Sequence, residues 1–184
     1  KLGANAILGV SLAVARIAAI DSSQPLYLYL KKKYWSKNKW SYPVPMMNIL
    51  NGGAHAGWSI DIQEFMVLPQ QKNVKEAVRC GAEIFQALKK ILKIKGYATT
   101  VGDEGGYAPK LPGNEKALSI ILQAIKKAGY RAGQEVKLGI DAATSEFYKD
   151  GVYALAADKK NRNVQEMIFM YESWLKKYPI KTLE

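Results

Sequence analysis

Residues 136–184 have the sequence VKLGIDAATSEFYKDGVYALAADKKNRNVQEMIFMYESWLKKYPIKTLE. Two short apolar runs, 136–140 and 180–183, predict buried strands, and each run ends at a carboxylate, Asp141 or Glu184. A strand that connects through a helix to a second strand is the layout of a parallel α/β barrel. These residues therefore predict the α/β fold class and a TIM-like (β/α) barrel.

The residues between the two predicted strands agree with this layout. Asn163 followed by Glu166 is the pattern of a capping box at a helix start, and Pro179 predicts the end of that helix. Earlier, the pair Asp150-Gly151 between aromatic and β-branched residues predicts a tight hairpin. The expected order is thus strand, hairpin, helix and strand.

Asp141 and Glu184 are candidate metal ligands. Residues at the carboxyl ends of barrel strands line the active site in this kind of fold. Two hard oxygen ligands that arrive from separate strands suit Mg²⁺. The alternative is that each carboxylate caps a helix or lies solvated in a loop, and strand spacing alone leaves both interpretations open.

A domain boundary is predicted in the linker 36–45, because Pro43 and Pro45 force an extended chain there. Helices are expected at 5–20 and 26–33. The first is expected to be a buried helix of small residues, since polar residues interrupt its apolar run too often for a membrane span. Beyond the linker, strands are expected at 44–49 and 62–68.

Two further helices are predicted between the strands. Apolar residues from Val74 to Leu92 keep the spacing of one helix face, with lysines and acids opposite. Asn114 is the expected N-cap of a second helix that ends before Gly129. The single cysteine, Cys80, excludes an intrachain disulfide, fits a reducing compartment and is expected to pack in the core.

The chain is strongly basic, with 27 Lys and Arg against 16 Asp and Glu and a formal net charge of +11. Such an excess of positive charge raises the question of whether the chain binds nucleic acid. Most lysines stand singly or in pairs on predicted helix faces, which argues against it. Only the basic run that begins at Lys31–Lys33 and continues to Trp40 has interleaved aromatics. A solvated connector with aromatic side chains beneath it is the interpretation we favour there.

Three segments, two loops and the start of one strand, carry residues that suit catalysis. The Gly-rich segment 51–59 holds His55, the only histidine, above the predicted barrel mouth, where a structural and a functional role are both open. Gln63 and Glu64 begin an otherwise apolar strand. Consecutive strand residues face opposite sides, so at most one points into the barrel unless the strand bends.

The third segment, 101–109, places Asp103 and Glu104 among three glycines. Such a sequence favours neither helix nor strand and suits a tight loop that holds carboxylates close together. Like charges at close range raise the pKa of one of them, and that is how a Glu becomes a general acid near neutral pH.

Taken together, the motifs resemble those of the enolases in order and spacing. The segments that carry the resemblance are GANAILGVS at 3–11, NGGAHA at 51–56, QEFM at 63–66, GDEGGYAP at 102–109 and SEFYKDG at 145–151. The resemblance covers essentially the whole chain. It implies a reversible dehydration of 2-phospho-D-glycerate to phosphoenolpyruvate by a Mg²⁺-dependent hydro-lyase.

The resemblance also implies a role for each matching residue. Glu104 corresponds to the proton donor and Glu64 to a second catalytic carboxylate that also contacts substrate. Gln63 and His55 correspond to substrate-binding residues. Asp141 and Glu184 correspond to ligands of Mg²⁺, and Glu184 also to a substrate contact. In this superfamily a Lys or His base removes the proton while Mg²⁺ stabilises the ene-diolate.

By the same resemblance the chain is expected to be an incomplete enolase. Residues 1–40 would be the last helices of a small α+β domain plus linker, and 41–184 the first half of the barrel. The lysine base, a third metal carboxylate and a serine loop of the family would lie outside the chain. A homo-oligomer, dimer or octamer, in the cytoplasm is implied, although family members also occur at the cell surface. The alternative is a short non-catalytic binding or scaffold protein.

Overall fold

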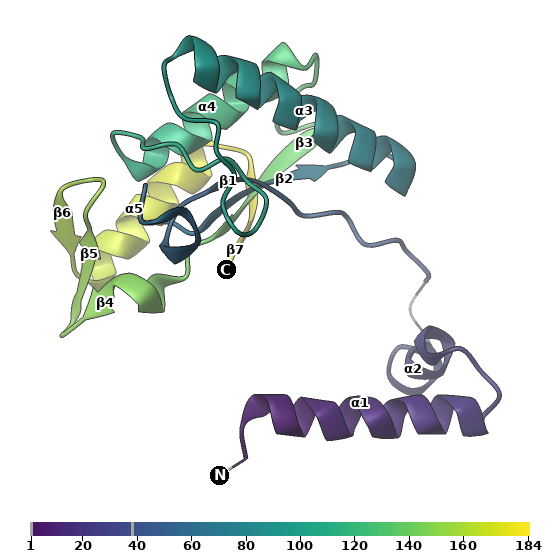
Figure 1. The fold of residues 1–184 in the computed structure, drawn as a ribbon. Helices are drawn as coiled ribbons and strands as arrows, with labels where there is room; N and C mark the ends of the chain where they lie inside the picture. The colour runs from purple at the N-terminus through teal and green to yellow at the C-terminus, as the bar shows by residue number, and fades with distance from the viewer. Residues whose placement is uncertain (1, 38) are drawn as a thin grey trace. The chain divides into compact units, whose positions relative to one another are not determined.

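The computed structural model describes residues 2–37 and 39–184 and divides the chain into two compact units, Lys1–Ser41 and Tyr42–Glu184 (Figure 1). Lys1 and Asn38, which both fall in the predicted N-terminal domain, lie outside the described residues. Two prolines, Pro43 and Pro45, follow directly after the point of division. Each unit is described below by itself.

The first unit is a pair of helices, α1 (Ala4–Asp21) and α2 (Leu26–Tyr34), which pack against each other. A tight turn joins them, with Ser23 in the left-handed region at φ 51°. The expectation that α1 is buried was wrong for the described residues. Ala19 is its only buried side chain, and Val10, Ile17 and Ile20 are each more than 60 % exposed.

α1 is also long and apolar enough to cross a membrane, judged by length and composition alone. The sequence-based argument that its polar residues exclude a span was therefore too strict. Helices in the cores of soluble proteins satisfy the same criterion, so the property by itself does not assign the helix to a bilayer.

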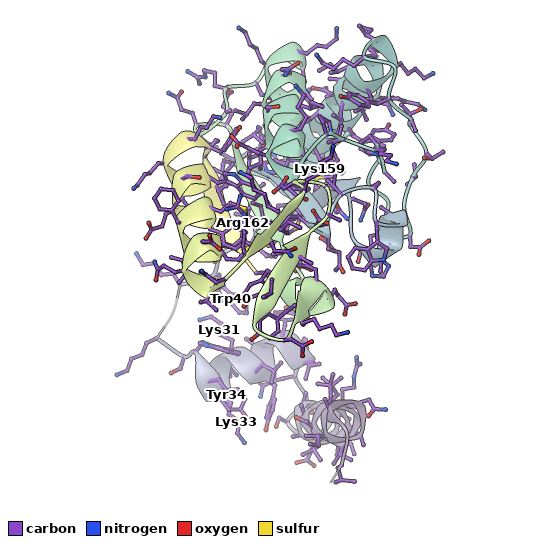
Figure 2. All side chains as sticks on the ribbon, turned by 90° about the vertical axis from the view of Figure 1, so that its left-hand side faces the viewer. Lys31, Lys33, Tyr34, Trp40, Lys159 and Arg162 are labelled. Carbon is purple, nitrogen blue, oxygen red and sulfur yellow. The ribbon has the colours of Figure 1, made fainter. Side chains whose placement is uncertain are left out.

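The basic segment after α1 pairs its lysines with aromatic rings. The Lys31 ammonium lies over the Trp40 ring (both labelled in Figure 2), 4.9 Å from its centre. Tyr27 packs edge-on against the same ring. Trp40 is 61 % exposed and Tyr34 is 62 % exposed. The prediction that aromatic side chains lie beneath this connector is therefore wrong for Tyr34 and Trp40, which share the surface with the lysines.

The second unit is built on a four-stranded sheet with the order β1-β2-β3-β7. Its strands are β1 (Met47–Asn51), β2 (Glu64–Pro69), β3 (Val136–Asp141) and β7 (Ile180–Leu183). The prediction of a parallel pair joined through a helix is confirmed for β3 and β7. The β1–β2 and β2–β3 pairs are antiparallel, so the sheet is mixed and forms an open part of a barrel.

A β-bulge interrupts the pairing of β1 with β2. Asn48 pairs with Met66 and Leu50 pairs with Phe65, which leaves Ile49 as an extra residue in β1. Such an insertion bends the strand and changes which way the following side chains point. As a result Ile49 and Leu50, although consecutive, are both buried.

Three long helices accompany the sheet (Figure 1): α3 (Val74–Ile94), α4 (Asn114–Lys127) and α5 (Val164–Lys177). α3 contacts both β2 and α4, and the buried faces of all three helices join the sheet in one apolar core. Cys80 on α3 is fully buried in that core, as predicted, and burial raises the pKa of its thiol. The predicted capping box of α5 is present.

Smaller elements complete the unit. The predicted hairpin is formed by β4 (Tyr148–Lys149) and β5 (Val152–Leu155), and β6 (Lys160–Arg162) extends it to a three-stranded sheet. Two short 3₁₀ helices, η1 (Ala54–Ala56) and η2 (Thr144–Phe147), lie in the loops after β1 and β3.

Asn114 is not the N-cap of α4, as the sequence suggested, but its first helical residue. Its fully buried side chain binds another segment. The amide oxygen accepts from the backbone N–H groups of Asp61 and Ile62 at 2.9 and 3.1 Å, and Nδ2 donates to the Asp61 carboxylate at 2.8 Å. Asp61 also accepts from Ala156 N at 2.8 Å. This buried network ties the residues before β2 to α4 and to the hairpin.

We predict that Asn114→Leu destabilises the chain by on the order of 3 kcal/mol, because the change removes one donor from the buried Asp61 carboxylate and leaves two buried N–H groups without a partner. Urea unfolding followed by circular dichroism measures the loss. Asn161→Leu, at an exposed residue of β6, is the matched control and should change the stability by less than about 0.5 kcal/mol. Equal midpoints for the Asn114 variant and the native chain would contradict the role of the network.

Candidate functional site

The ends of the four core strands bring the candidate residues to one edge of the sheet. Asn51 pairs with Glu64, and Glu64 pairs in turn with Asp141 across β2 and β3. Ile140 pairs with Leu183, so Glu184 follows at the same level. Backbone hydrogen bonds from Glu184 N to Ile140 O at 2.9 Å and from Ala142 N to Glu184 O at 3.0 Å fix this register. Antiparallel and parallel strands thus contribute to one site.

Asp141 lies between two donors. Its Oδ2 accepts from Gln63 Nε2 at 3.2 Å, and its Oδ1 accepts from Ala143 N at 3.1 Å. The second contact is local, of the kind that Asp makes where a strand turns into a loop. The N-cap of η2, the helix that follows Asp141, is Ala143, so the capping alternative is excluded for Asp141.

The sequence argument that only one of Gln63 and Glu64 could face the site does not hold. β2 begins at Glu64, so Gln63 precedes the strand and does not follow its alternation. Gln63 contacts Asp141, while Glu64 lies close to Glu104 as well as to Asp141 and Glu184. Both side chains therefore contribute to the same group of residues.

The Gly-rich loop that carries Glu104 is attached to the edge of β1. Tyr107 N donates to Ile49 O at 3.0 Å, and Asn51 N donates to Tyr107 O at 2.8 Å. The loop closes on itself through a bond from Gly102 N to Gly106 O at 2.8 Å. Gly105 has a φ of +90°, which only glycine adopts without strain, so the tight turn after Glu104 depends on it.

Besides Glu64, the Glu104 carboxylate in this loop has two neighbours on other elements. Glu104 Oε2 accepts from Asn51 Nδ2 at 2.8 Å, and Glu104 Oε1 lies 3.5 Å from His55 Nε2. The other ring nitrogen of His55 lies 3.7 Å from Asp103 Oδ2. His55 on η1 is 41 % exposed, so it stands at the surface of the site between two acids.

Sequence reasoning missed Asn51. Its side chain is fully buried at the end of β1 and bonds both Glu104 and the backbone N–H of Gly106. The signal that was available is a polar residue that directly follows the apolar run 49–50 and precedes two glycines. A buried amide must be paired, so a partner in a nearby loop was to be expected.

The charges of the site act most strongly on Glu64. Burial raises the pKa of its carboxyl from 4.5 to about 7, and the neighbouring Glu104 adds to the rise through its charge and a hydrogen bond. The charges of Asp141 and Glu184 contribute further. A carboxyl whose pKa lies near neutrality holds and releases a proton under ordinary conditions, which is the property of a general acid or base.

Among the described residues, no three His, Cys, Asp or Glu side chains are grouped so that they could hold a metal ion by themselves. Asp141 and Glu184 nevertheless offer oxygen ligands from adjacent strand ends, in a region where like charges repel each other. Oxygen donors and excess negative charge are what Mg²⁺ requires. The chemistry of the pair fits such an ion, while the number of ligands in the described chain is too small for a complete site.

We predict that the metal-free chain titrates Glu64 at about pH 7 and that Glu104→Gln lowers this value, because the change removes a neighbouring charge. Carbon-13 NMR of the glutamate carboxyls measures it, with Glu172→Gln on the exposed face of α5 as the control. The folded state binds the proton more tightly than the unfolded state does. Glu64 therefore stabilises the fold below about pH 4.5, and this contribution is lost as the pH rises to about 7. A Glu64 titration near pH 4.5 would contradict the prediction.

Comparison with known families gives a match over most of the chain. The family model described as "Enolase, C-terminal TIM barrel domain" matches residues 39–184. The matched range contains the whole four-stranded sheet and every candidate site residue discussed above.

Proposed function

The chain belongs to the enolase family, and on that basis we propose that it carries the proton-donating side of a hydro-lyase site that interconverts 2-phospho-D-glycerate and phosphoenolpyruvate. The observation that supports this most directly is the cluster around Glu104. There a carboxyl on a Gly-rich loop meets Glu64, His55 and a buried amide at one edge of the sheet.

The residues of this chain would divide the dehydration between them. Hydroxide is a poor leaving group, so the bond from C3 to oxygen breaks only if an acid delivers a proton to that oxygen. We assign this step to Glu104. Glu64, whose carboxyl holds a proton near neutral pH, would lie beside the leaving hydroxyl and donate a hydrogen bond to it.

Two further side chains would position the substrate. His55 lies on a loop with Gly53 and Gly57 on either side of η1, both at positive φ. It would close over the bound substrate and shield it from water. Gln63, whose amide already reaches Asp141, would bind the substrate next to the metal ligands.

Asp141 and Glu184 would hold Mg²⁺ together with ligands from outside this chain. When bound, the ion stabilises the negative charge that develops beside the substrate carboxylate as the C2 proton leaves. Glu184, which follows β7 directly, would also lie within reach of the substrate. The base for the C2 proton would likewise come from outside residues 1–184.

The same family membership supports the remaining proposals. Residues 1–40 would be the last helices of a small α+β domain with its linker, and residues 41–184 the first half of the barrel. The complete protein would form a homo-oligomer in the cytoplasm. A single buried thiol agrees with a reducing compartment.

We predict that the chain of residues 1–184 alone does not form phosphoenolpyruvate from 2-phosphoglycerate with Mg²⁺ present, because no lysine base is assigned within it. An absorbance assay for phosphoenolpyruvate measures this, with the complete enzyme as the positive control. Turnover above a protein-free blank would contradict the assignment of the base to another part of the protein.

In the complete protein, we predict that Glu104→Gln lowers kcat for dehydration by about 10²- to 10⁴-fold, the range of general acid catalysis. Gln keeps the size and hydrogen bonding of Glu but carries no transferable proton. Exchange of the C2 proton with solvent should persist, because that step uses a different group. Glu172→Gln is the matched control. Equal losses of exchange and turnover would show that Glu104 only orders its loop.

A further inference from the structure

We propose that Asn51 is a positioning residue for the Glu104 carboxyl, an inference that rests on the proposed function of Glu104. Asn51 ends β1, and none of its surface is exposed. Each end of its amide has one partner: Nδ2 donates to Glu104 Oε2 at 2.8 Å, and Oδ1 accepts from Gly106 N at 2.7 Å. One side chain thus joins the rigid sheet to both the catalytic carboxyl and the turn that follows it.

The orientation of the amide follows from its partners. A backbone N–H can only donate, so the Gly106 contact requires the amide oxygen on that side. The NH₂ group must then face Glu104. An amide held in this way presents a donor to one oxygen of the carboxyl and to no other group that the described residues place there.

The loop is shaped around Asn51. A β-carbon added at Gly106 would lie 2.5 Å from Asn51 Oδ1, and one added at Gly102 would lie 3.2 Å from the β-carbon of Asn51. Both glycines, two residues on either side of Glu104, therefore let the backbone approach this amide closely. Since Asn51 N also donates to Tyr107 O, the contact fixes the loop at several points.

This arrangement also makes the two oxygens of the Glu104 carboxyl unequal. Oε2 accepts a hydrogen bond from the Asn51 NH₂ group, which can only donate. Oε1 lies 3.5 Å from His55 Nε2. Asn51 thereby turns Oε1 toward the side of the loop on which His55 lies, with Glu64 and Asp103 as the other ionisable neighbours.

Two substitutions in the complete protein separate positioning from support of the loop. Asn51→Asp keeps the size and the acceptor for Gly106 N but replaces the donor with a carboxylate that repels Glu104. Asn51→Leu removes both contacts. We expect both to lower kcat for dehydration by about 10- to 100-fold, the effect of one hydrogen bond to a charged group. KM and exchange of the C2 proton should stay within about twofold of the native values.

Asn73→Asp is the matched control, because it makes the same chemical change at the N-cap of α3, where Asp caps as well as Asn. If Asn51→Asp does not fold, Asn51→Ser replaces it in the test. Serine is neutral and too short to reach Glu104 from the strand, so we expect the same loss of kcat. Native kcat in Asn51→Asp beside a loss in Asn51→Leu would overturn the proposal, since Asn51 would then support only the loop. Equal losses of exchange and turnover would overturn it too.

The Glu104→Gln variant keeps the two proposals distinguishable. If that variant retains native turnover, the assignment of Glu104 as the acid fails, and with it the role of Asn51. If Glu104→Gln loses dehydration while the Asn51 variants do not, only the positioning role is wrong.

Discussion

Repulsion among carboxylates at one edge of the sheet is the constraint on which the rest of the site depends. Glu64, Glu104, Asp141 and Glu184 come from four different segments, and burial together with the charges of the other three raises the pKa of Glu64 to about 7. Such a group of acids is held together only by strands whose register is fixed elsewhere. The apolar core beneath the sheet supplies that support, since β2 and β3 are almost fully buried.

Neutral amides moderate this repulsion without adding charge. Asn51 donates to Glu104, and Gln63 donates to Asp141, so two of the acids each have a fixed hydrogen-bond donor. A lysine in either place would form an ion pair with the acid and favour its ionised form, so the carboxyl would no longer hold a proton readily. An amide holds a carboxylate in position and leaves it able to bind a proton or a metal ion. A third amide, the buried Asn114, does the same for Asp61 away from the site.

The sequence was sufficient for those features that a local pattern determines. The capping box at Asn163, the hairpin at Asp150-Gly151 and the parallel pair of β3 and β7 depend on neighbours in the chain or on apolar periodicity, and each is present. What could not be predicted depends on contacts across about fifty residues. Asn114 looked like a helix cap because its bonds to Asp61 and Ile62 come from a distant loop, and Asn51 was overlooked for the same reason. The antiparallel direction of β2 is likewise a property of the assembled sheet.

The bulge at Ile49 determines which side of the sheet each later side chain of β1 faces. Because one extra residue is inserted between the pairs at Asn48 and Leu50, the side chains after it lie half a period away from those of a regular strand. Asn51 belongs to this shifted part, so the direction of its side chain depends on the number of residues in β1 as well as on the polarity of the amide. Loss of one residue before Asn51 would leave an apolar strand that still pairs with β2 but turns the amide away from the Glu104 loop. The length of this strand therefore determines the direction of the Asn51 amide as much as its composition does.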